Sequence, residues 1–555
     1  MKLCFLMILS CFTCAFQVAG KTLDRGYTES VKYYDYVRKA DWLQQVHSVE
    51  GWDWSLPIWV KPSPNSGVMS RIKPFPGQDL PFNRFTGLNA TWASLEPEDG
   101  TYTFEGLMEK LDKMYERNIG VELHLRYCTY RTEYFSRTGD KIDFTKVIMT
   151  ENGAAPEWLK SLYGVATQEY TPNTTAPVPF RITNYDIYDE LFYARFFDLL
   201  EAMDTAGVFT HPAVKRLYLH EPSSTRGEEG AGPQPGEKNH VKYILKMEKW
   251  AEILGKDVSK LMYTGYSGKN LETAVKLGMG QRNGFVEMYL RHVGNPNLGL
   301  HLDESGYMYV DETYAPIKEA RAWGDENEEY TEMKFHPRFG AIETFPQRYL
   351  SSSLMALVMR RNSLWEQGNA KTLNPELTAY VGLSLGKTSS DSPDAWCCLR
   401  ESRVLKWDSF KDTLVYKNFE RWLVQRDVPG AETVPVRPVP HGIQKLAADD
   451  FDYMARKGNR MFFWADDTFL KRRGRYSVKI SHYDNTDIVM YVYTDSGYTK
   501  YNVPVSGSGR LHTSTVIVEG IEKSVSSKQP DIILEASGDM PMEVAMLRIV
   551  HIDPI

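Results

Sequence analysis

The sequence predicts an α/β fold, a (β/α)8 TIM barrel followed by an all-β sandwich, and three observations support this prediction. Between about residues 80 and 400, short apolar runs alternate with amphipathic helical stretches, as in parallel sheets. Seven or eight such units in one stretch favour a closed barrel over an open sheet. Beyond about residue 426, apolar residues recur at every second position instead, which indicates antiparallel β-structure.

Three helices are the clearest elements of the barrel region. Apolar side chains recur at helical spacing over residues 104–115, 192–203 and 243–254, and a glycine follows each run. The expected strands lie before, between and after these helices, at Phe82–Trp92, Val121–Tyr127, Val214–His220, Lys260–Tyr266, Gly284–Leu290, Lys318–Gly324 and Arg361–Trp365. No Gly-x-Gly-x-x-Gly motif follows any of these strands, which disfavours a dinucleotide-binding fold.

The composition changes at Asp427–Gly430, and we expect the proline-rich segment Val434–His441 that follows to be a stiff linker or an irregular edge. Beyond it, Tyr476–Ile480 and several later runs alternate with period two and are separated by turn residues. We therefore expect a catalytic barrel over residues 21–425 and a β-sandwich accessory domain over residues 426–555.

The first twenty residues have the pattern of an export signal. Lys2 precedes the apolar run Leu3–Phe16, and the small residues Val18–Gly20 precede the expected cleavage site. A lipoprotein signal ending at Cys11 or Cys14 is the alternative. The expected location is therefore secreted or periplasmic, with a surface lipoprotein as the second possibility.

Composition excludes several classes of function. The chain has 65 Lys and Arg against 72 Asp and Glu, a formal charge of −7, and no basic block, so nucleic-acid binding is not expected. No stretch has the roughly 20 apolar residues that a membrane span needs. Outside the signal, Cys128, Cys397 and Cys398 form neither a metal-binding spacing nor an even disulfide framework. We expect neither a metal nor another cofactor.

Two carboxylates follow expected strands where catalytic groups of a barrel stand. Glu221 ends the run Arg216–Pro222, in which an apolar strand is followed by an acid and a proline. Glu326 opens an acidic cluster after Lys318–Gly324. Two carboxyl groups about 5–5.5 Å apart would make a retaining glycosidase, in which one protonates the leaving oxygen and the other attacks the anomeric carbon.

The segment Asn89–Phe104, with Trp92 and Glu96 in Trp-Ala-Ser-Leu-Glu-Pro-Glu-Asp-Gly-Thr-Tyr-Thr-Phe, resembles a motif of clan A glycoside hydrolases. That motif occurs in family 42-type beta-galactosidases and in related hydrolases of algal and plant polysaccharides. His220-Glu221-Pro222 is similar to the Asn-Glu-Pro that ends the fourth barrel strand in this clan. The resemblance implies that Glu221 is the general acid/base and that the nucleophile ends the seventh strand, where Glu326 lies. We interpret Glu96 as structural.

Several assignments stay open. His220 replaces the asparagine that binds the sugar 2-hydroxyl in the clan, which puts that contact in doubt. Glu228 competes with Glu221 as the acid. Glu328, and less directly Glu343, compete with Glu326 as the nucleophile.

The expected substrate-binding residues stand at strand ends or in the tryptophan motif: Trp92, His124, Arg126, His220, Tyr289, Arg291 and Trp365. In the clan, a tyrosine near the end of the sixth strand contacts the nucleophile, and an aromatic residue after the eighth forms the sugar-site floor. Arg126 and Arg291 suit an anionic sugar because guanidinium groups match oxyanions. The long segment Thr129–Thr183 is expected to wall one end of the pocket.

The sequence thus predicts a secreted retaining glycoside hydrolase acting on a β-linked poly- or oligosaccharide, most closely a β-galactan of the agar or carrageenan type. Two alternatives remain: a non-catalytic carbohydrate-binding protein with a barrel, and a hydrolase of another plant β-glycan such as mannan or xylan. A metal enzyme using His124, His220 and Glu221 is disfavoured because no two histidines have ligand spacing. A serine hydrolase is disfavoured because no Gly-x-Ser-x-Gly motif occurs.

Overall fold

The computed structural model describes residues 51–70, 82–139, 141–170, 172–174, 178–220, 232–264, 268–284, 299–325, 345–366, 375–405, 413–440, 451–471, 474–523 and 529–554. The chain forms two compact units, one built around residues 84–283 and the other containing residues 284–555. None of the helices in the described ranges has the length and apolar character needed to cross a lipid bilayer.

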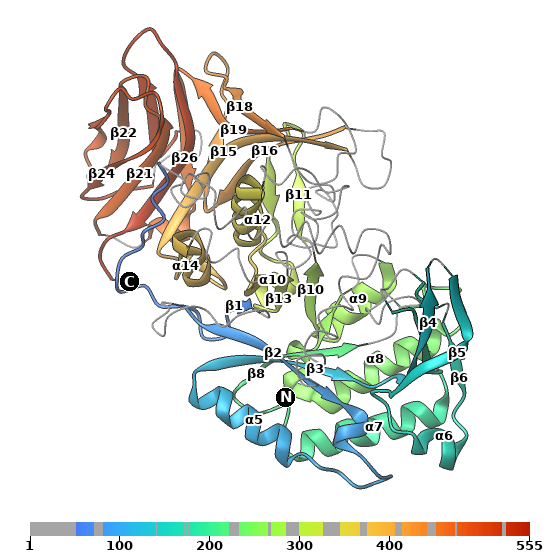
Figure 1. The fold of residues 1–555 in the computed structure, drawn as a ribbon. Helices are drawn as coiled ribbons and strands as arrows, with labels where there is room; N and C mark the ends of the chain where they lie inside the picture. Colours follow the sequence, from blue (N-terminus) through green and yellow to red (C-terminus); the bar gives the residue numbers. More distant parts are fainter. Residues whose placement is uncertain are drawn as a thin grey trace. The chain divides into compact units, whose positions relative to one another are not determined.

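The barrel strands follow one another along the chain (Figure 1). They are β1 (Gly67–Ser70), β2 (Arg84–Thr91), β3 (Ile119–Arg126), β8 (Val214–His220), β9 (Met262–Tyr263), β10 (Gly280–Gly284), β13 (Ala322–Asp325) and β14 (Ser363–Glu366). They pair in the orders β14-β1-β2-β3-β8 and β13-β10-β9, and a parallel bridge joins Leu217 of β8 to Leu261 before β9. This is the strand order of a (β/α)8 barrel, so the predicted fold class is confirmed.

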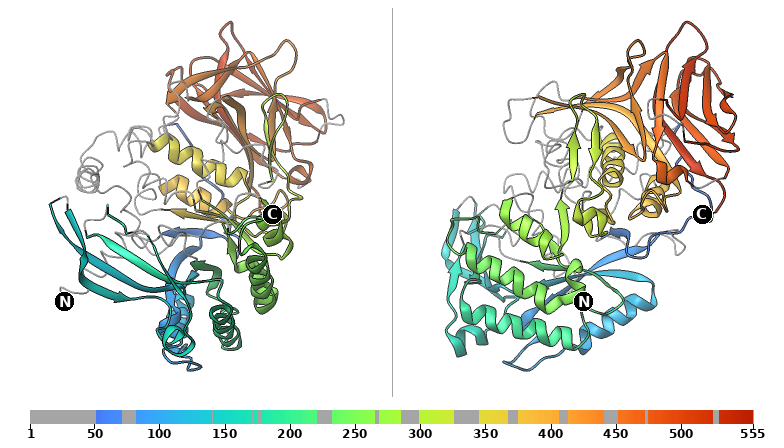
Figure 2. Two further views of the ribbon diagram at one scale, coloured as in Figure 1. Left: turned by 90° about the vertical axis from the view of Figure 1, so that its right-hand side faces the viewer. Right: turned by 180° about the vertical axis from the view of Figure 1, so that it is seen from behind.

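The helices of the first unit cover one side of its parallel strands (Figure 2). They are α4 (Trp92–Leu95), α5 (Glu105–Glu116), α7 (Glu190–Thr205), α8 (His240–Leu254) and α9 (Gly268–Lys276), with a 3-10 turn at Gly255–Lys260. The carboxylate of Asp189 caps α7 by accepting hydrogen bonds from the N–H groups of Leu191 and Phe192. Its apolar stripe, including Phe196 and Met203, is fully buried against the strands, which is why this segment packs as a helix here.

A separate antiparallel sheet is inserted after the third barrel strand. It comprises β4 (Thr129–Thr138), β5 (Lys141–Asn152), β6 (Thr167–Glu169) and β7 (Phe180–Tyr185), in the order β5-β4-β7-β6, with α6 (Trp158–Tyr163) between β5 and β6. The segment 129–183 is thus a folded subdomain at the carboxyl end of β3, where barrel enzymes place substrate-binding loops.

In the second unit, backbone hydrogen bonds connect three barrel strands directly. Asn362, next to β14, donates to Ala322 of β13 at 2.8 Å and accepts from Gly67 of β1 at 3.1 Å. The helices of this unit are α10 (Ala315–Lys318), α12 (Phe345–Val358) and α14 (Pro375–Ser384), and a short hairpin is formed by β11 (Leu300–Leu302) and β12 (Met308–Val310).

Two antiparallel sheets form the C-terminal part and enclose one apolar core. The first contains β15 (Asp394–Leu405), β16 (Thr413–Arg421), β18 (Val434–Pro440), β19 (Phe451–Gly458), β21 (Tyr476–Tyr483), β24 (Leu511–Val518) and β26 (Met542–His551). The second has the order β17-β20-β25-β22-β23, from β17 (Leu423–Arg426), β20 (Arg460–Ala465), β25 (Ile532–Ala536), β22 (Ile488–Thr494) and β23 (Gly497–Val503). A short helix, α15 (Asp467–Leu470), follows β20.

The strands of these sheets begin before residue 426, where the sequence analysis placed the boundary between barrel and sandwich. β15 starts at Asp394 and pairs antiparallel with the last strand, β26, from Asp394 to Cys398. The proline-rich segment expected to be a linker or an irregular edge is the strand β18, paired with β19. Prolines are tolerated there because β18 pairs through one side only.

Other predicted elements differ from the observed ones in position. The sixth strand is Gly280–Gly284, whereas the prediction placed it at Gly284–Leu290, of which residues 285–290 lie outside the described ranges. The start of the predicted strand Lys318–Gly324 is the end of α10, so β13 begins only at Ala322. The first barrel strand, β1, was not predicted because its four residues are too few to show a period.

Candidate functional site

Polar side chains occupy one face of β3, the third barrel strand. The odd-numbered residues from Val121 to Leu125 belong to the core covered by the helices. Glu122, His124 and Arg126 lie between them and therefore project from the opposite face, toward the barrel interior. Glu122 and His124 are each 2% exposed, whereas Arg126, the last residue of the strand, is exposed.

The neighbouring strand β8 has the same alternation. Leu217 and Leu219 join the helix-covered core, so Arg216 and Tyr218 belong to the interior face. Parallel pairing places Glu122 opposite Arg216, His124 opposite Tyr218 and, in backbone register, Arg126 opposite His220. These three pairs form successive rows across the two strands, and the last row stands at the carboxyl ends of the strands.

Glu122 and Arg216, the pair farthest from the carboxyl ends of the strands, form with His124 what we call the interior charge cluster. His124 Nε2 lies 2.6 Å from Glu122 Oε1, and Arg216 Nη1 lies 3.3 Å from Glu122 Oε2. Burial alone would raise the pKa of Glu122, but the charges of Arg216 and His124 hold it well below its usual range. Glu122 is therefore an ionised, paired carboxylate and not a general acid.

A second pair lies in the middle row. Arg282, on β10, donates a 2.5 Å hydrogen bond to the Tyr218 hydroxyl, and its guanidinium lies 4.5 Å from the centre of the same ring. The Tyr218 ring packs edge-on against His124, with centroids 4.9 Å apart. On β2, a Cβ atom at Gly87 would come within 3.3 Å of His124 Nε2, so glycine there leaves room for the imidazole. His124 is thus fixed from three sides below the strand ends.

The tryptophan motif after β2 has a structural explanation. Trp92 is fully buried, and its Nε1 donates a 2.7 Å hydrogen bond to Glu96. Glu96 also accepts from the backbone N–H of Gly100 at 2.9 Å, and Arg195 lies 3.8 Å from the same carboxylate. Gly100 has φ of 72°, which favours glycine. Glu96 is therefore structural, as predicted, and Trp92 contributes to the core of the described structure.

The two proposed catalytic residues, Glu221 and Glu326, lie outside the described residues, and so do Tyr289 and Arg291. The competing acids Glu228, Glu328 and Glu343 also lie outside them. For His220 and Trp365 the structure describes the backbone only, at the end of β8 and within β14. Of the predicted substrate-binding residues, the structure therefore describes the side chains of Trp92, His124 and Arg126.

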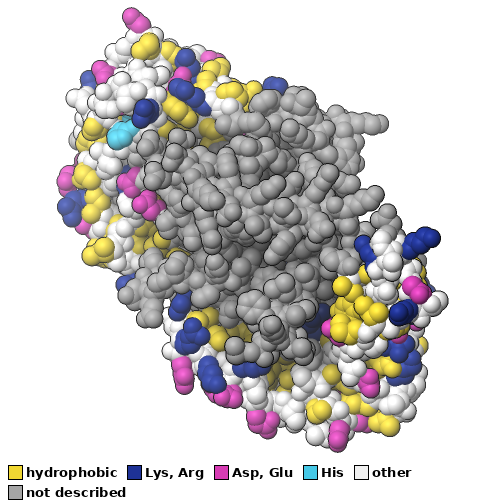
Figure 3. Space-filling model, in the orientation of Figure 1, with side chains coloured by type: hydrophobic (Ala, Val, Ile, Leu, Met, Phe, Trp, Pro, Cys, Tyr) yellow, Lys and Arg dark blue, Asp and Glu magenta, His cyan; other side chains and the backbone are white. Residues whose placement is uncertain are grey.

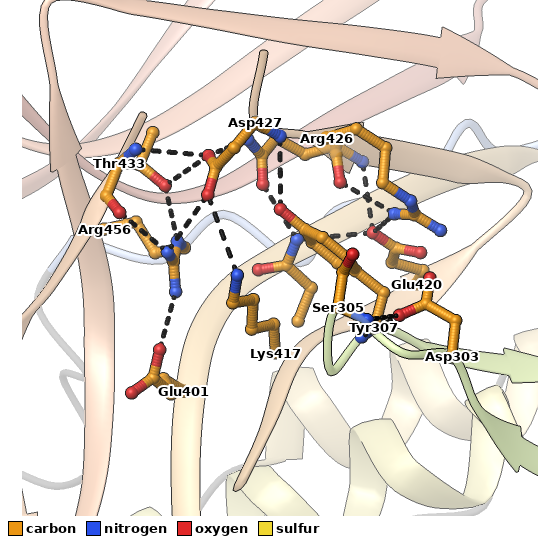
Figure 4. Close-up of polar contacts among 12 residues, drawn as sticks. Asp303, Ser305, Tyr307, Glu401, Lys417, Glu420, Arg426, Asp427, Thr433 and Arg456 are labelled. Carbon is orange, nitrogen blue, oxygen red and sulfur yellow. Dashed lines mark hydrogen bonds and ion pairs between the residues drawn. The ribbon is translucent and has the colours of Figure 1, made fainter. Parts of the chain in front are cut away.

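The second unit contains a buried polar network near the hairpin β11–β12 (Figure 4). The Arg456 guanidinium donates to Thr433 Oγ1 at 2.6 Å and to Glu401 at 3.1 Å, and it lies 3.5 Å from Asp427. The Tyr307 hydroxyl accepts from the backbone N–H of Asp427 at 3.1 Å, and burial raises the pKa of this tyrosine.

Glu420, the other acid in this network, is paired through one of its two oxygens. Glu420 Oε1 accepts hydrogen bonds from Arg426 Nη1 at 2.6 Å and from the backbone N–H of Gln425 at 3.1 Å. Oε2 is buried without a hydrogen-bond partner in the described structure, and burial raises the pKa of this carboxyl group. Arg426 in turn lies 4.2 Å from the centre of the Tyr307 ring (Figure 4). Because each of these carboxylates has a cationic partner, the network fastens the hairpin to the neighbouring strands.

Thiol and metal chemistry find little support in the described residues. Burial raises the pKa of Cys128 to about 12 and that of Cys398 to about 11, so both thiols stay protonated at neutral pH. No group of three or more His, Cys, Asp or Glu side chains in the described ranges is placed to hold a metal ion.

On the face shown in Figure 3, basic and acidic side chains are interspersed.

Sequence reasoning missed four residues of the barrel interior: Glu122, Arg216, Tyr218 and Arg282. A signal was present for three of them, because Glu-Leu-His-Leu-Arg in β3 and Arg-Leu-Tyr-Leu-His in β8 alternate polar and apolar residues. In a barrel both faces of a strand are buried, so an alternating polar face indicates a polar interior. Arg282 had no such signal, since the sixth strand was predicted four residues too late.

No protein-family model matches the chain, and no curated protein matches it. Solved structures do resemble it. The beta-galactosidase of Rahnella sp. R3 is 11% identical with a TM-score of 0.29, and the match covers 54% of this chain and 50% of that one. Endo-glycoceramidase II of Rhodococcus sp. is 10% identical with a TM-score of 0.29, covering 89% and 99%. The beta-galactosidase of Halorubrum lacusprofundi is 11% identical with a TM-score of 0.29, covering 57% of each chain. These structures are glycoside hydrolases, and at such low similarity the function has to be argued from this chain's own residues.

Proposed function

We propose that the protein is a retaining glycoside hydrolase, with Glu221 as general acid/base and Glu326 as nucleophile. The observation that supports this is the place of each acid in the strand order. Counted along the chain, β8 is the fourth barrel strand and ends at His220, directly before Glu221. β13 is the seventh and ends at Asp325, directly before Glu326. Catalytic residues of barrel enzymes stand at these carboxyl ends.

In the proposed reaction, the Glu221 carboxyl group protonates the glycosidic oxygen while a Glu326 oxygen attacks the anomeric carbon. The bond to the leaving sugar breaks, and a glycosyl ester on Glu326 forms. Glu221, now ionised, takes a proton from a water molecule that attacks the same carbon and releases Glu326. Two inversions at one carbon give a product with the substrate's configuration.

The proposed substrate is a β-linked galactan of the agar or carrageenan type. In support, Arg126 is exposed at the end of β3, and its guanidinium suits a sulfate or carboxylate of the polysaccharide. Arg291, His220, Tyr289 and Trp365 complete the proposed binding residues. The buried His124 and Trp92 support the site from beneath, by fixing β3 and the loop after β2.

We also propose that the chain is exported, with cleavage after Gly20. The amino-terminal mass of the secreted protein tests this, and an acylated Cys11 or Cys14 would show a lipoprotein instead.

Hydrolysis of a polysaccharide panel, followed by reducing-end detection, tests the function. The wild-type protein should release reducing ends from an agar- or carrageenan-type galactan, and Glu221→Gln and Glu326→Gln should each lower the rate by at least about a thousandfold. Glu328→Gln is the matched control and should stay near the wild-type rate. Activity on mannan or xylan alone would reject the galactan. Binding without any turnover would favour the non-catalytic alternative.

A further inference from the structure

The five-stranded C-terminal sheet has an aromatic outer face. On β22, Ile488, Met490 and Val492 belong to the core between the two sheets. Tyr491 and Tyr493 alternate with them and are partly exposed. Because side chains of a strand point alternately to its two faces, both tyrosines project from the side of the sheet that faces away from this core.

Apolar side chains of the adjacent strands continue this face. Tyr493 lies opposite Tyr498 of β23, and the two ring centroids are 5.4 Å apart at an interplanar angle of 78°. Tyr491 lies opposite Ile533 of β25, which lies opposite Phe462 of β20. Directly paired residues share a face, so these side chains lie on the same side of the sheet. Ile533 and Phe462 are each only 8% exposed, so the tyrosines of β22 and β23 form its accessible part.

Trp464, two residues beyond Phe462 on β20, adds an indole ring. Its side chain is partly exposed, whereas its Nε1 atom is buried and not accessible to a ligand on this face. Within the described residues, no hydrogen bond involves the hydroxyl of Tyr491 or Tyr493. These two hydroxyls can therefore donate to, and accept from, a ligand that brings hydroxyl groups to this face.

The edges of the face are polar. Arg460 and Glu535, on β20 and β25, form an ion pair at 3.2 Å, and Lys500 and Asn502 are exposed on β23. Among the described residues of this face, Tyr498 has the only large hydrophobic side chain that is well exposed, with 37% of its surface accessible to solvent. The surface combines ring faces, hydroxyls and nearly balanced charge, which suits a ligand with both C–H faces and many hydroxyls more than an apolar protein surface.

We propose that this face, defined by Trp464, Tyr491, Tyr493 and Tyr498, is a glycan-binding site that holds a polysaccharide chain independently of the catalytic residues. Sugar rings pack their C–H groups on the tyrosine and tryptophan rings, and their hydroxyls hydrogen-bond to the phenol oxygens. The choice of a β-galactan as the first ligand rests on the proposed function, whereas the existence of the site does not.

Native electrophoresis through gels that contain a soluble polysaccharide tests the site. The probes are a neutral galactan, a sulfated galactan, xylan and mannan, and every chain tested is full-length and carries Glu221→Gln so that the matrix stays intact. Tyr491→Ala/Tyr493→Ala removes two rings, and Tyr491→Phe/Tyr493→Phe removes only their hydroxyls. Tyr115→Ala, which removes a 58% exposed tyrosine of α5, is the control. Melting curves confirm that each variant is folded.

The parent chain should be retarded in at least one gel. The double alanine variant should bind that polysaccharide about tenfold or more weakly, with the double phenylalanine variant between the two and the control unchanged. Equal retardation of the parent and the double alanine variant, or no retardation of the parent in any gel, overturns the proposal. Tyrosine-dependent retardation of a chain whose unmodified form hydrolyses nothing would uphold the site and reject the hydrolase.

Discussion

His124 Nε2 lies 2.6 Å from Glu122 Oε1 inside the barrel, where each of the two side chains is 3% exposed. They are two residues apart on β3 and share its interior face, and Arg216 of the adjacent strand approaches the second Glu122 oxygen to 3.3 Å. Charged side chains that are buried this deeply need a partner of opposite charge, because removing one partner leaves the other buried and unpaired. The floor beneath the strand ends is therefore held by electrostatics as well as by packing.

Glu122→Gln should lower the free energy of unfolding by about 3–5 kcal/mol, because it keeps the side-chain shape but removes the charge that compensates Arg216. Chemical denaturation at pH 7 measures this. Glu109→Gln is the control, since Glu109 pairs with Lys113 on the exposed surface of α5, where solvent screens such pairs and they contribute little to stability. Equal losses in the two variants would contradict the account of the interior charge cluster.

The destabilisation by Glu122→Gln should depend on pH. The folded-state pKa of Glu122 is depressed, so its contribution is complete above the unfolded-state pKa of about 4.3 and is lost as the pH falls toward the folded-state value. The difference in unfolding free energy between wild type and variant should be constant from pH 5 to 7. Below about pH 4 it should shrink by about 1.4 kcal/mol per pH unit. A difference that stays constant down to pH 3 would show that Glu122 has an ordinary pKa.

Lys246→Met should stabilise the first unit by on the order of 1 kcal/mol at pH 7. Lys246 is 2% exposed on α8, with the Tyr243 and Trp250 ring centres each 4.6 Å from Nζ, and burial holds its pKa well below the usual range. Between the folded-state and unfolded-state pKa of Lys246 the unfolded chain binds more protons than the folded chain, so the wild-type protein gains stability as the pH rises through that range. The advantage of the variant should therefore disappear near pH 10.5. An advantage independent of pH would contradict this explanation.

Glu96→Ala tests whether the tryptophan motif is structural. Losing the acceptor for the buried Trp92 Nε1 should cost about 1–3 kcal/mol of stability. Turnover per folded molecule on the substrate found in the panel should change by less than about threefold, since Glu96 is itself fully buried. A loss of kcat by two orders of magnitude in fully folded protein would assign Glu96 a catalytic role.

Arg126→Ala and Arg291→Ala should each raise KM about tenfold or more on a sulfated galactan, because a charge-assisted hydrogen bond contributes about 1.5–3 kcal/mol. On the desulfated polymer the same substitutions should have much smaller effects. Equal losses on the two polymers would show that these arginines are structural.

The sequence was most informative where one period dominates. Val214–His220 was predicted with both ends correct, because apolar and polar residues alternate along it and an acid and a proline follow its last residue. Trp92 was expected to bind sugar, but its indole is fully buried and donates to Glu96, one helical turn further along the chain. Composition could not show that the indole is covered by the packing of the core. The outer tyrosines of β22 were visible as residues, yet their neighbours on β20 and β25 come from strand pairings that no local pattern contains.

The most direct test of the central claim is to trap the glycosyl-enzyme. The full-length protein is incubated with a 2-deoxy-2-fluoro-β-galactoside that has a dinitrophenyl leaving group, digested, and sequenced by mass spectrometry. The fluorine slows both formation and hydrolysis of the covalent intermediate, and the activated leaving group restores the rate of formation only, so the ester accumulates. We predict a single glycosylated peptide, with the sugar on Glu326. A label on Glu328 or Glu343 would contradict the nucleophile assignment, and turnover without any covalent label would contradict the retaining mechanism.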